Sequence, residues 1–488
     1  MKNQNHSIQY NFIMNFLLTA TNFIFPLITF PYITRVLQAE GTGTVSFAAS
    51  VTNYFLMVAN LGIPTYGIRA TAKARDNKNE LTKVCHELLI INAVTTILSL
   101  AAYLVAIALV PQFREEKQLF YINTINVVLN LFGMHWLFQG LEQYDYITFR
   151  SVAAKIISVV LMISLVHSES DYVLYAAISI FAAAGTNILN FIRAGRYISF
   201  RPQKNYQLRK HIKPILVLFA QTMVVSVYTN LDTVMLGLMN GNSEVGLYTT
   251  AVKVKGILLS LVSSLGAVLL PRMSNVVQRG DTNQFNELTK KALNVTMLMA
   301  FPLSIYFCIY AKESVLFLAG DGFIGAVLAM QIITVSIIPN GLTGVLGIQV
   351  LTSIEKEKYV LYSVTAGAIS DFLLNLVFIP NYGAAGAAFA TTVAEFIVLL
   401  MQLYYTKKII APVKKQLLTH IYVIGTIAAS VLSWVAVRLL NLEMVFAVLC
   451  VSAMVFGVVY FAVLYLFKEP LVIQYLNKFK NVAGKLSK

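Results

Sequence analysis

The sequence predicts an all-helical (all-α) integral membrane protein with about fourteen transmembrane helices. Two observations support this prediction: 57% of the 488 residues are hydrophobic and only 12% are charged, and the mean hydropathy is +0.70. Soluble chains contain roughly 45–50% apolar and about 25% charged residues, so the main solvent of this chain is lipid. The composition excludes a cytosolic enzyme, a secreted module and a disordered regulator.

Apolar stretches that can cross a bilayer follow one another along almost the whole chain. A bilayer core needs about 20 such residues in a helix. The first stretch also serves as the insertion signal, because no small-residue cleavage site follows it. The loops left between the stretches are too short for a catalytic domain, so we do not expect an enzyme. The expected spans are residues 11–36, 43–66, 84–110, 118–141, 148–166, 170–193, 213–239, 244–270, 291–311, 323–352, 358–380, 383–406, 417–438 and 443–467.

Lys and Arg are distributed unevenly between the loops. The loops after even-numbered spans hold 23 of them, whereas the loops after odd-numbered spans hold 4. Because cytoplasmic loops collect Lys and Arg, we expect both termini to lie in the cytoplasm. The same asymmetry explains most of the net charge of +15, so we do not expect nucleic-acid binding.

An internal repeat indicates two pseudo-symmetric lobes of six helices. The segment around Glu142 aligns with that around Glu355, and the turn at Gly43 matches the turn at Gly246. Two lobes that face each other across a cavity form a transporter architecture, in which rocking opens the cavity to alternate sides. The expected organisation is a first lobe at 1–196, a basic linker at 197–212, a second lobe at 213–410, a helix pair at 411–467 and a basic tail at 468–488.

Four cationic side chains that are not counted with the loops fall inside the expected spans, where charge is costly and marks function. Lys253 and Lys255 are two residues apart, so they point about 160° away from each other around a helix, and we favour Lys253 for the cavity. The interpretation is a cationic cavity for an anionic substrate such as a diphosphate. For Arg35 and Lys155, an equal alternative is that the side chain extends to the membrane interface and has no role in the cavity. The four are Arg35, Lys155, Lys253 and Lys255.

A second polar set within the spans is rich in oxygen atoms. Asp371 and Asn375 stand four residues apart and therefore share a helical face. Such oxygens suit Na⁺ or H⁺ as a coupling ion, although Asp371 can equally pair with Lys253 or Lys255. No phosphate-binding loop is present, so we expect neither ATP drive nor another cofactor. The set consists of Asp232, Asp371, Asn375, Thr391 and Glu395.

Three segments carry a family resemblance. Phe30–Leu37, Trp136–Tyr144 and Asn381–Ala388 resemble signatures of Wzx-type polysaccharide flippases, in the polysaccharide transporter branch of the MATE-like MOP superfamily. The resemblance implies a MATE-like fold that moves an undecaprenyl-diphosphate-linked oligosaccharide from the inner to the outer leaflet of the bacterial cytoplasmic membrane. The glycan would serve capsule, O-antigen or a similar polymer. It also implies a glycan polymerase and glycosyltransferases as partners, and a groove for the lipid tail at the terminal helix pair.

The cation site is also implied by resemblance, here to lipid II flippases of the same superfamily. Asp232, Asp371, Asn375 and Thr391 resemble its ligands, although the Asp and Asn appear in exchanged order. The cation of the eighth span is Lys where that family has Arg. Because two lobes complete the cavity in one chain, we expect a functional monomer.

Three other functions stay open as alternatives. A lipid II flippase would use the same machinery. A MATE-type antiporter of cationic drugs is disfavoured because a cationic cavity repels its substrates. A membrane glycosyltransferase or polymerase is disfavoured because the outward loops are short and hold few carboxylates.

Overall fold

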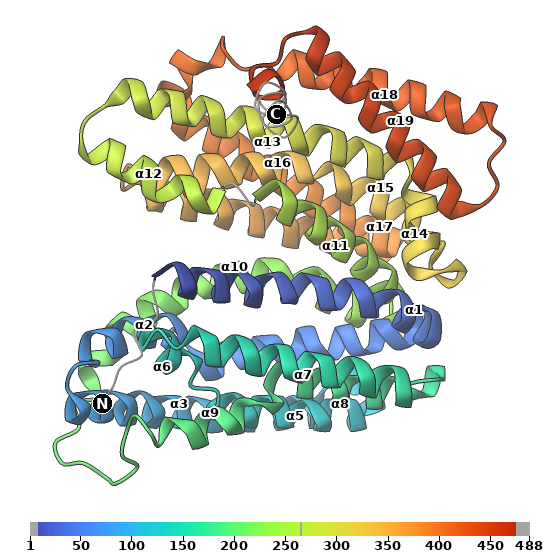
Figure 1. Cartoon of the computed structure of the whole chain (residues 1–488). Coiled ribbons are helices and arrows are strands. Elements are labelled where there is room, and N and C mark those ends of the chain that lie inside the picture. The colour runs from blue at the N-terminus through green and yellow to red at the C-terminus, as the bar shows by residue number, and fades with distance from the viewer. Residues whose placement is uncertain (1–7, 264–265, 475–488) are drawn as a thin grey trace, which may run out of the picture. The chain divides into compact units, whose positions relative to one another are not determined.

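The chain folds into helices joined by turns and short loops (Figure 1). The computed structural model describes residues 8–263 and 266–474, and these residues contain no strand, which confirms the all-helical prediction. Within this part of the chain, ten helices are long and apolar enough to cross a membrane, or eleven if a bent helix pair counts as one span. The protein is therefore a multi-pass membrane protein, but the expected number of fourteen spans is not confirmed.

The lower count depends on how the helices are delimited. The elements α1 (Ile8–Asn60) and α17 (Glu357–Lys414) each consist of two helices joined at a non-helical residue, and each covers two expected spans. The breaks lie at Gln38, with a φ of 53°, and at Gly383, with a φ of 50°. In addition, α5 (Lys117–Leu131) has only 15 residues, which is short for a span.

The chain forms two compact units that divide between Gly246 and Leu247. In the first unit α10 is bent by 55° between Val224 and Tyr228. The expected limits of the lobes, linker and terminal pair stay predictions. Besides α1 and α5, the first unit contains α2 (Ile63–Ala74), α3 (Lys78–Leu109), α4 (Pro111–Glu115), α6 (His135–Gly140), α7 (Tyr144–Leu165), η1 (Glu169–Asp171), α8 (Tyr172–Ile180), the π-helix η2 (Phe181–Gly185), α9 (Asn187–Ala194) and α10 (Arg209–Met239).

The helix α11 (Asn242–Ser263) crosses the division between the units. In the second unit the terminal pair α18 and α19 is joined to α13 by tyrosine hydroxyls: Tyr306 lies 3.0 Å from Ser452 Oγ, and Tyr310 donates to Ser433 over 3.1 Å. Besides α17, the second unit contains α12 (Gly266–Gln278), α13 (Thr282–Ile309), α14 (Ala311–Ala319), η3 (Asp321–Phe323), α15 (Ala326–Val335), α16 (Ile337–Thr343), the π-helix η4 (Gly344–Leu351), α18 (Thr419–Leu439) and α19 (Val445–Leu466).

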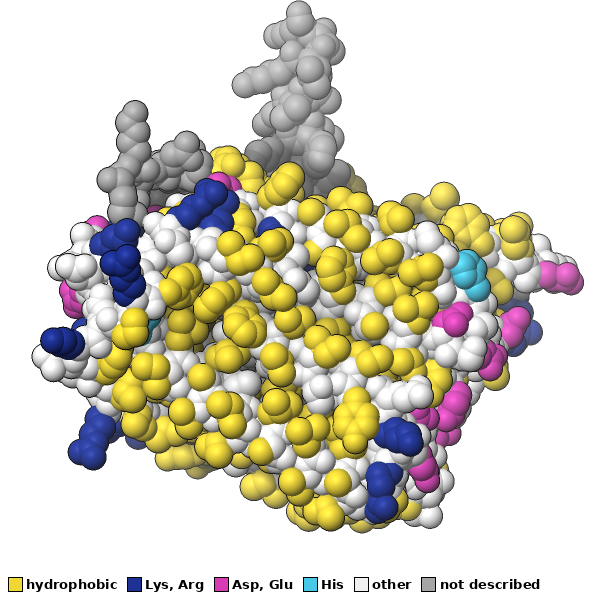
Figure 2. All heavy atoms as spheres, turned by 90° about the horizontal axis from the view of Figure 1, so that it is seen from below, with side chains coloured by type: hydrophobic (Ala, Val, Ile, Leu, Met, Phe, Trp, Pro, Cys, Tyr) yellow, Lys and Arg dark blue, Asp and Glu magenta, His cyan; other side chains and the backbone are white. Residues whose placement is uncertain are grey.

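The outer surface is apolar, as a lipid-facing surface must be. Figure 2 shows a face whose middle is covered by hydrophobic side chains, with many Lys and Arg at its left end and most Asp and Glu, together with further Lys or Arg, at its right end. Many large apolar side chains of the spanning helices are not covered by other protein atoms, among them Phe149, which is 81% exposed. Charge at both ends of an apolar band is the pattern expected where helices leave a bilayer.

The internal repeat is visible in the backbone. Glu142 and Glu355, which align in sequence, both adopt left-handed conformations, with φ values of 59° and 57°. Gln38 and Gly241, each five residues before a glycine of the aligned turns, also have positive φ values, of 53° and 93°. The same chain path is therefore followed twice.

The two aligned turns also pack against each other within the first unit. A Cβ atom at Gly43 would lie 1.7 Å from the carbonyl oxygen of Asn242, and a Cβ at Gly246 would lie 2.0 Å from that of Ala39. Both separations are far below van der Waals contact. Glycine is therefore required at both positions by the close approach of two backbones.

Candidate functional site

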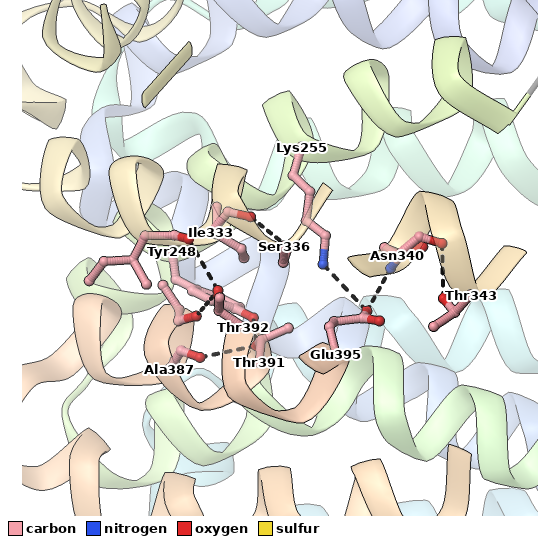
Figure 3. A network of polar contacts seen from close by, with 12 residues as sticks. Tyr248, Lys255, Ile333, Ser336, Asn340, Thr343, Ala387, Thr391, Thr392 and Glu395 are labelled. Carbon is pink, nitrogen blue, oxygen red and sulfur yellow. Dashed lines mark hydrogen bonds and ion pairs between the residues drawn. The ribbon is translucent and has the colours of Figure 1, made fainter. Parts of the chain in front are cut away.

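A buried polar network in the second unit joins α11, α16 and α17 (Figure 3). At its centre is Glu395, whose Oε1 accepts a hydrogen bond of 2.6 Å from Asn340 Nδ2. The same oxygen lies 3.7 Å from Lys255 Nζ. One carboxylate of α17 thus has a neutral partner on α16 and a charged partner on α11.

The lysine and the glutamate of this network form a buried ion pair. Their side chains are 11% and 6% exposed, so solvent screens the two charges little. The separation of 3.7 Å is longer than a charge-assisted hydrogen bond of about 2.7–2.9 Å. Lys255 therefore neutralises the charge of Glu395 at a distance, whereas Asn340 donates a short, directional hydrogen bond to it.

Glycines allow α17 to bend before it reaches this carboxylate. The helix breaks at Gly383, and a Cβ at Gly386 would lie 2.3 Å from the carbonyl oxygen of Phe378. Beyond the break, the hydroxyl of Thr392 donates to the carbonyl oxygen of Ile332 in α15 over 3.1 Å. The second half of α17 is thereby fixed against α15.

The neutral partner comes from an irregular helix. Asn340 lies in the short helix α16, whose backbone continues as the π-helix η4. Its carbonyl oxygen accepts a hydrogen bond of 2.9 Å from the hydroxyl of Thr343. π-Helical turns are rare and frequently occur at functional sites.

The predicted cation ligands are buried, but they are divided between the two units. Thr391 lies one turn before Glu395; its hydroxyl is 3.0 Å from that of Tyr248. Asp371 and Asn375, in the first half of α17, are both 0% exposed. Asp232 is 5% exposed and belongs to α10 of the first unit. Over the described ranges no group of three or more His, Cys, Asp or Glu side chains gathers as a metal site, and the Na⁺ site stays a prediction.

The four predicted cations differ in their surroundings. Lys255 is buried in the ion pair, whereas Lys253, two residues earlier on α11, is exposed. Arg35 is exposed, and its Nη1 donates to the carbonyl oxygen of Pro31 over 2.7 Å. Lys155 is half-buried on α7 of the first unit and donates a hydrogen bond of 3.2 Å to the hydroxyl of Thr21 on α1.

A buried cluster in the first unit is missed by the sequence analysis. Glu87 of α3 is 0% exposed, and its Oε2 lies 2.7 Å from His211 Nε2 and 3.2 Å from Lys210 Nζ. Its Oε1 accepts a hydrogen bond of 2.6 Å from the backbone NH of Gln207, and the other ring nitrogen of His211 lies 2.8 Å from the hydroxyl of Tyr66. The only sequence signal is a His-Glu pair early in an apolar helix.

The histidine of that pair holds the same linker at a second point. His86 Nε2 lies 2.7 Å from the carbonyl oxygen of Ser199, so this nitrogen donates. The opposite ring nitrogen then accepts from the hydroxyl of Tyr206, at 2.9 Å. We call the contacts of His86 and Glu87 with residues 199–211 the linker anchor.

Comparison with known sequences covers more than half of the chain. The family model described as "Polysaccharide biosynthesis protein" matches residues 8–277. A protein of Escherichia coli K12 named "Putative O-antigen transporter" is 25% identical over 404 residues, which are 82% of this chain and 97% of the relative.

Two solved structures resemble the fold. The structure of the lipid II flippase MurJ in an inward closed conformation has a TM-score of 0.74 at 15% identity, over 94% of this chain and 100% of that one. An inward-facing multidrug MATE transporter of the MOP superfamily has a TM-score of 0.61 at 13% identity, over 80% of this chain and 95% of that one. The MATE-like fold class is confirmed.

Proposed function

We propose, because the chain belongs to the polysaccharide biosynthesis protein family, that it is a flippase that moves lipid-linked oligosaccharide units across a membrane. The observation that carries the proposal is that spanning helices with polar and charged groups buried between them take up most of the chain. Such groups inside a membrane line pathways for polar cargo. The match to a relative named as an O-antigen transporter over 97% of its length supports the same function.

The finer form of the proposal concerns substrate and direction. The cargo is an undecaprenyl-diphosphate-linked repeat unit for an O-antigen or capsule type of polymer, moved from the inner to the outer leaflet of the bacterial cytoplasmic membrane. The excess of Lys and Arg in alternate loops supports termini that both lie in the cytoplasm. A polymerase and glycosyltransferases are the expected partners of a monomeric carrier.

The mechanism we propose is alternating access with a cationic cavity. Lys253 is the residue of α11 that suits the diphosphate, because it is exposed while the charge of Lys255 is balanced by Glu395. Arg35 and Lys155 add positive charge in the first unit. Arg and Lys match phosphate oxygens by charge and hydrogen bonding, while the polyprenyl tail stays in lipid.

Ion coupling is part of the same proposal. Asp371, Asn375 and Thr391 supply carboxylate, amide and hydroxyl oxygens within one helix, and Asp232 is the fourth proposed ligand. Oxygen donors of this kind suit Na⁺, and a carboxylate can carry H⁺ instead. Removal of the Asp371 carboxylate should therefore make transport insensitive to the driving gradient.

A transport assay with purified protein in liposomes tests the function. The probe is a fluorescent undecaprenyl-diphosphate oligosaccharide, followed with and without Na⁺ and proton gradients. We expect leaflet transfer that Lys253→Gln lowers about tenfold or more, because a charged hydrogen bond to phosphate is lost. Lys291→Gln, an exposed lysine of α13, is the matched control and should leave the rate unchanged.

Two other outcomes would redirect the assignment. Transfer of a peptide-bearing lipid II in place of the oligosaccharide would favour a lipid II flippase, which the fold similarity to MurJ keeps as the second candidate. Uptake of soluble organic cations without transfer of any lipid-linked sugar would overturn the flippase proposal.

A further inference from the structure

Two guanidinium groups of the first unit gather over one tyrosine ring. The guanidinium of Arg193, in α9, lies 3.9 Å from the ring centre of Tyr146, and that of Arg150, in α7, lies 5.6 Å from it. Arg150 is 6% exposed. An aromatic face attracts such cations, but it leaves their positive charge in place.

Neither guanidinium has a carboxylate partner among the residues that the structure describes. Arg150 donates through Nη1 to the carbonyl oxygen of Thr186 over 3.0 Å, and its Nη2 lies 3.4 Å from His135 Nδ1. The Nε atoms of Arg150 and Arg193 are both buried, and over the described ranges neither has a hydrogen-bond partner. Buried charges are normally paired with an opposite charge. Arg150 and Arg193 lie side by side without such a partner in the described part of the chain, which points to an anion that binds from outside the chain.

A groove leads away from these two cations. It has a volume of about 600 Å³ and is lined by α1, α7 and α9. Arg193 and Tyr146 form one part of its wall, while Met14, Leu17 and Val152 supply apolar walls. The groove therefore offers both charge and a hydrocarbon surface.

A third cation lies farther along the same helix. Lys155 follows Tyr146 by nine residues, which corresponds to about 13 Å along α7. It bonds to Thr21, which also lines the groove. The carboxylate of Asp145 lies in the wall as well, opposite in charge to Arg193, while Arg150 and Lys155 lie beside the groove on α7 without lining it.

We propose that this groove binds the phosphate or diphosphate group of an anionic membrane lipid, with the hydrocarbon chain along the apolar wall. The guanidinium of Arg193 matches phosphate oxygens, the buried charge of Arg150 on the same tyrosine ring adds to the attraction, and Met14, Leu17 and Val152 match the chain. An amphiphile fits better than a free phosphate ion because much of the wall is apolar and the helices around it face lipid. The inference does not depend on the flippase proposal, because bulk phospholipids and polyprenyl diphosphates share this chemistry.

Lipid binding by the full-length protein in neutral detergent tests the inference, with native mass spectrometry as the readout. The probes are phosphatidylglycerol, undecaprenyl diphosphate and zwitterionic phosphatidylcholine. We expect Arg193→Gln to weaken binding of at least one of the two anionic lipids about tenfold, the loss of one charge-assisted hydrogen bond. Arg196→Gln is the matched control, because Arg196 is exposed in the same basic segment and does not line the groove.

The two anionic probes distinguish the sources of the phosphate. Loss for both lipids assigns the groove to phosphate lipids in general, and loss for undecaprenyl diphosphate alone assigns it to polyprenyl carriers. Equal weakening by Arg196→Gln, unchanged binding in Arg193→Gln or equal binding of phosphatidylcholine would each overturn the inference.

A second measurement locates the ligand independently of affinity. A photoreactive group on the lipid chain should crosslink to Leu17 or Val152, and the crosslink should disappear in Arg193→Gln but persist in Arg196→Gln. Crosslinks spread evenly over the lipid-facing surface would contradict a defined groove.

Discussion

Replacement of Gly246 by alanine tests whether the two aligned turns need their close backbone contact. The new Cβ would lie 2.0 Å from the carbonyl oxygen of Ala39, whereas ordinary contact begins at 3.4 Å, so one backbone must shift by about 1.4 Å. Overpacking of this kind costs about 1–3 kcal/mol, and the obstacle here is backbone and not a flexible side chain. For a unit of this size each kcal/mol lowers the unfolding midpoint by about 2–4 °C.

The measurement is the thermal unfolding midpoint of the purified protein in detergent, for Gly246→Ala and for the reciprocal variant Gly43→Ala. The control is Gly457→Ala in α19, where no atom lies within 4 Å of the added Cβ. Alanine is favoured over glycine inside a helix, so this control should raise the midpoint or leave it unchanged. If Gly246→Ala and Gly457→Ala gave the same midpoint, the turn contact would not contribute to stability and the reasoning would be refuted.

Two further predictions concern buried carboxylates. Glu395→Gln should destabilise the second unit by about 3–5 kcal/mol because it leaves the ammonium of Lys255 buried without its counter-charge. Adding Lys255→Met should restore most of the decrease in the thermal unfolding midpoint. Equal midpoints for the single and double variants would disprove the coupling. Glu87→Gln should weaken the linker anchor by about 1.5–3 kcal/mol, measured as faster tryptic cleavage of the linker, while the exposed Glu80→Gln on the same helix should cleave at the wild-type rate.

The fold could be predicted from the sequence because its main determinant is composition. Apolar runs identify spanning helices without knowledge of their partners, and the alignment of Glu142 with Glu355 anticipates two equal backbone conformations. The number of spans was harder to predict, because hydropathy does not show that two helices meet end to end at Gln38 and again at Gly383. A kink within a helix depends on backbone contacts that hydropathy does not record.

The site could be predicted only in part, because a contact between two helices depends on how they pack and not on the sequence of either helix alone. Helical geometry alone separates Lys253 from Lys255, and the structure gives them different burial. The pairing of Lys255 with Glu395 depends on the approach of α11 to α17 and could not be predicted from spacing. Arg150 stands at the start of the expected span 148–166 and is counted with the basic residues of the preceding loop, so its burial beside Tyr146 became visible only in the folded chain.

The linker anchor has a consequence for how the polypeptide can be cut. The exposed residues Lys204 and Asn205 lie between two points, Ser199 and Gln207, that are both fastened to α3. A nick between them leaves each new end attached to the same helix, one through His86 and the other through Glu87. The protein could then be produced as two separate polypeptides, split after Lys204, that assemble on co-expression and keep their contacts without a covalent connection.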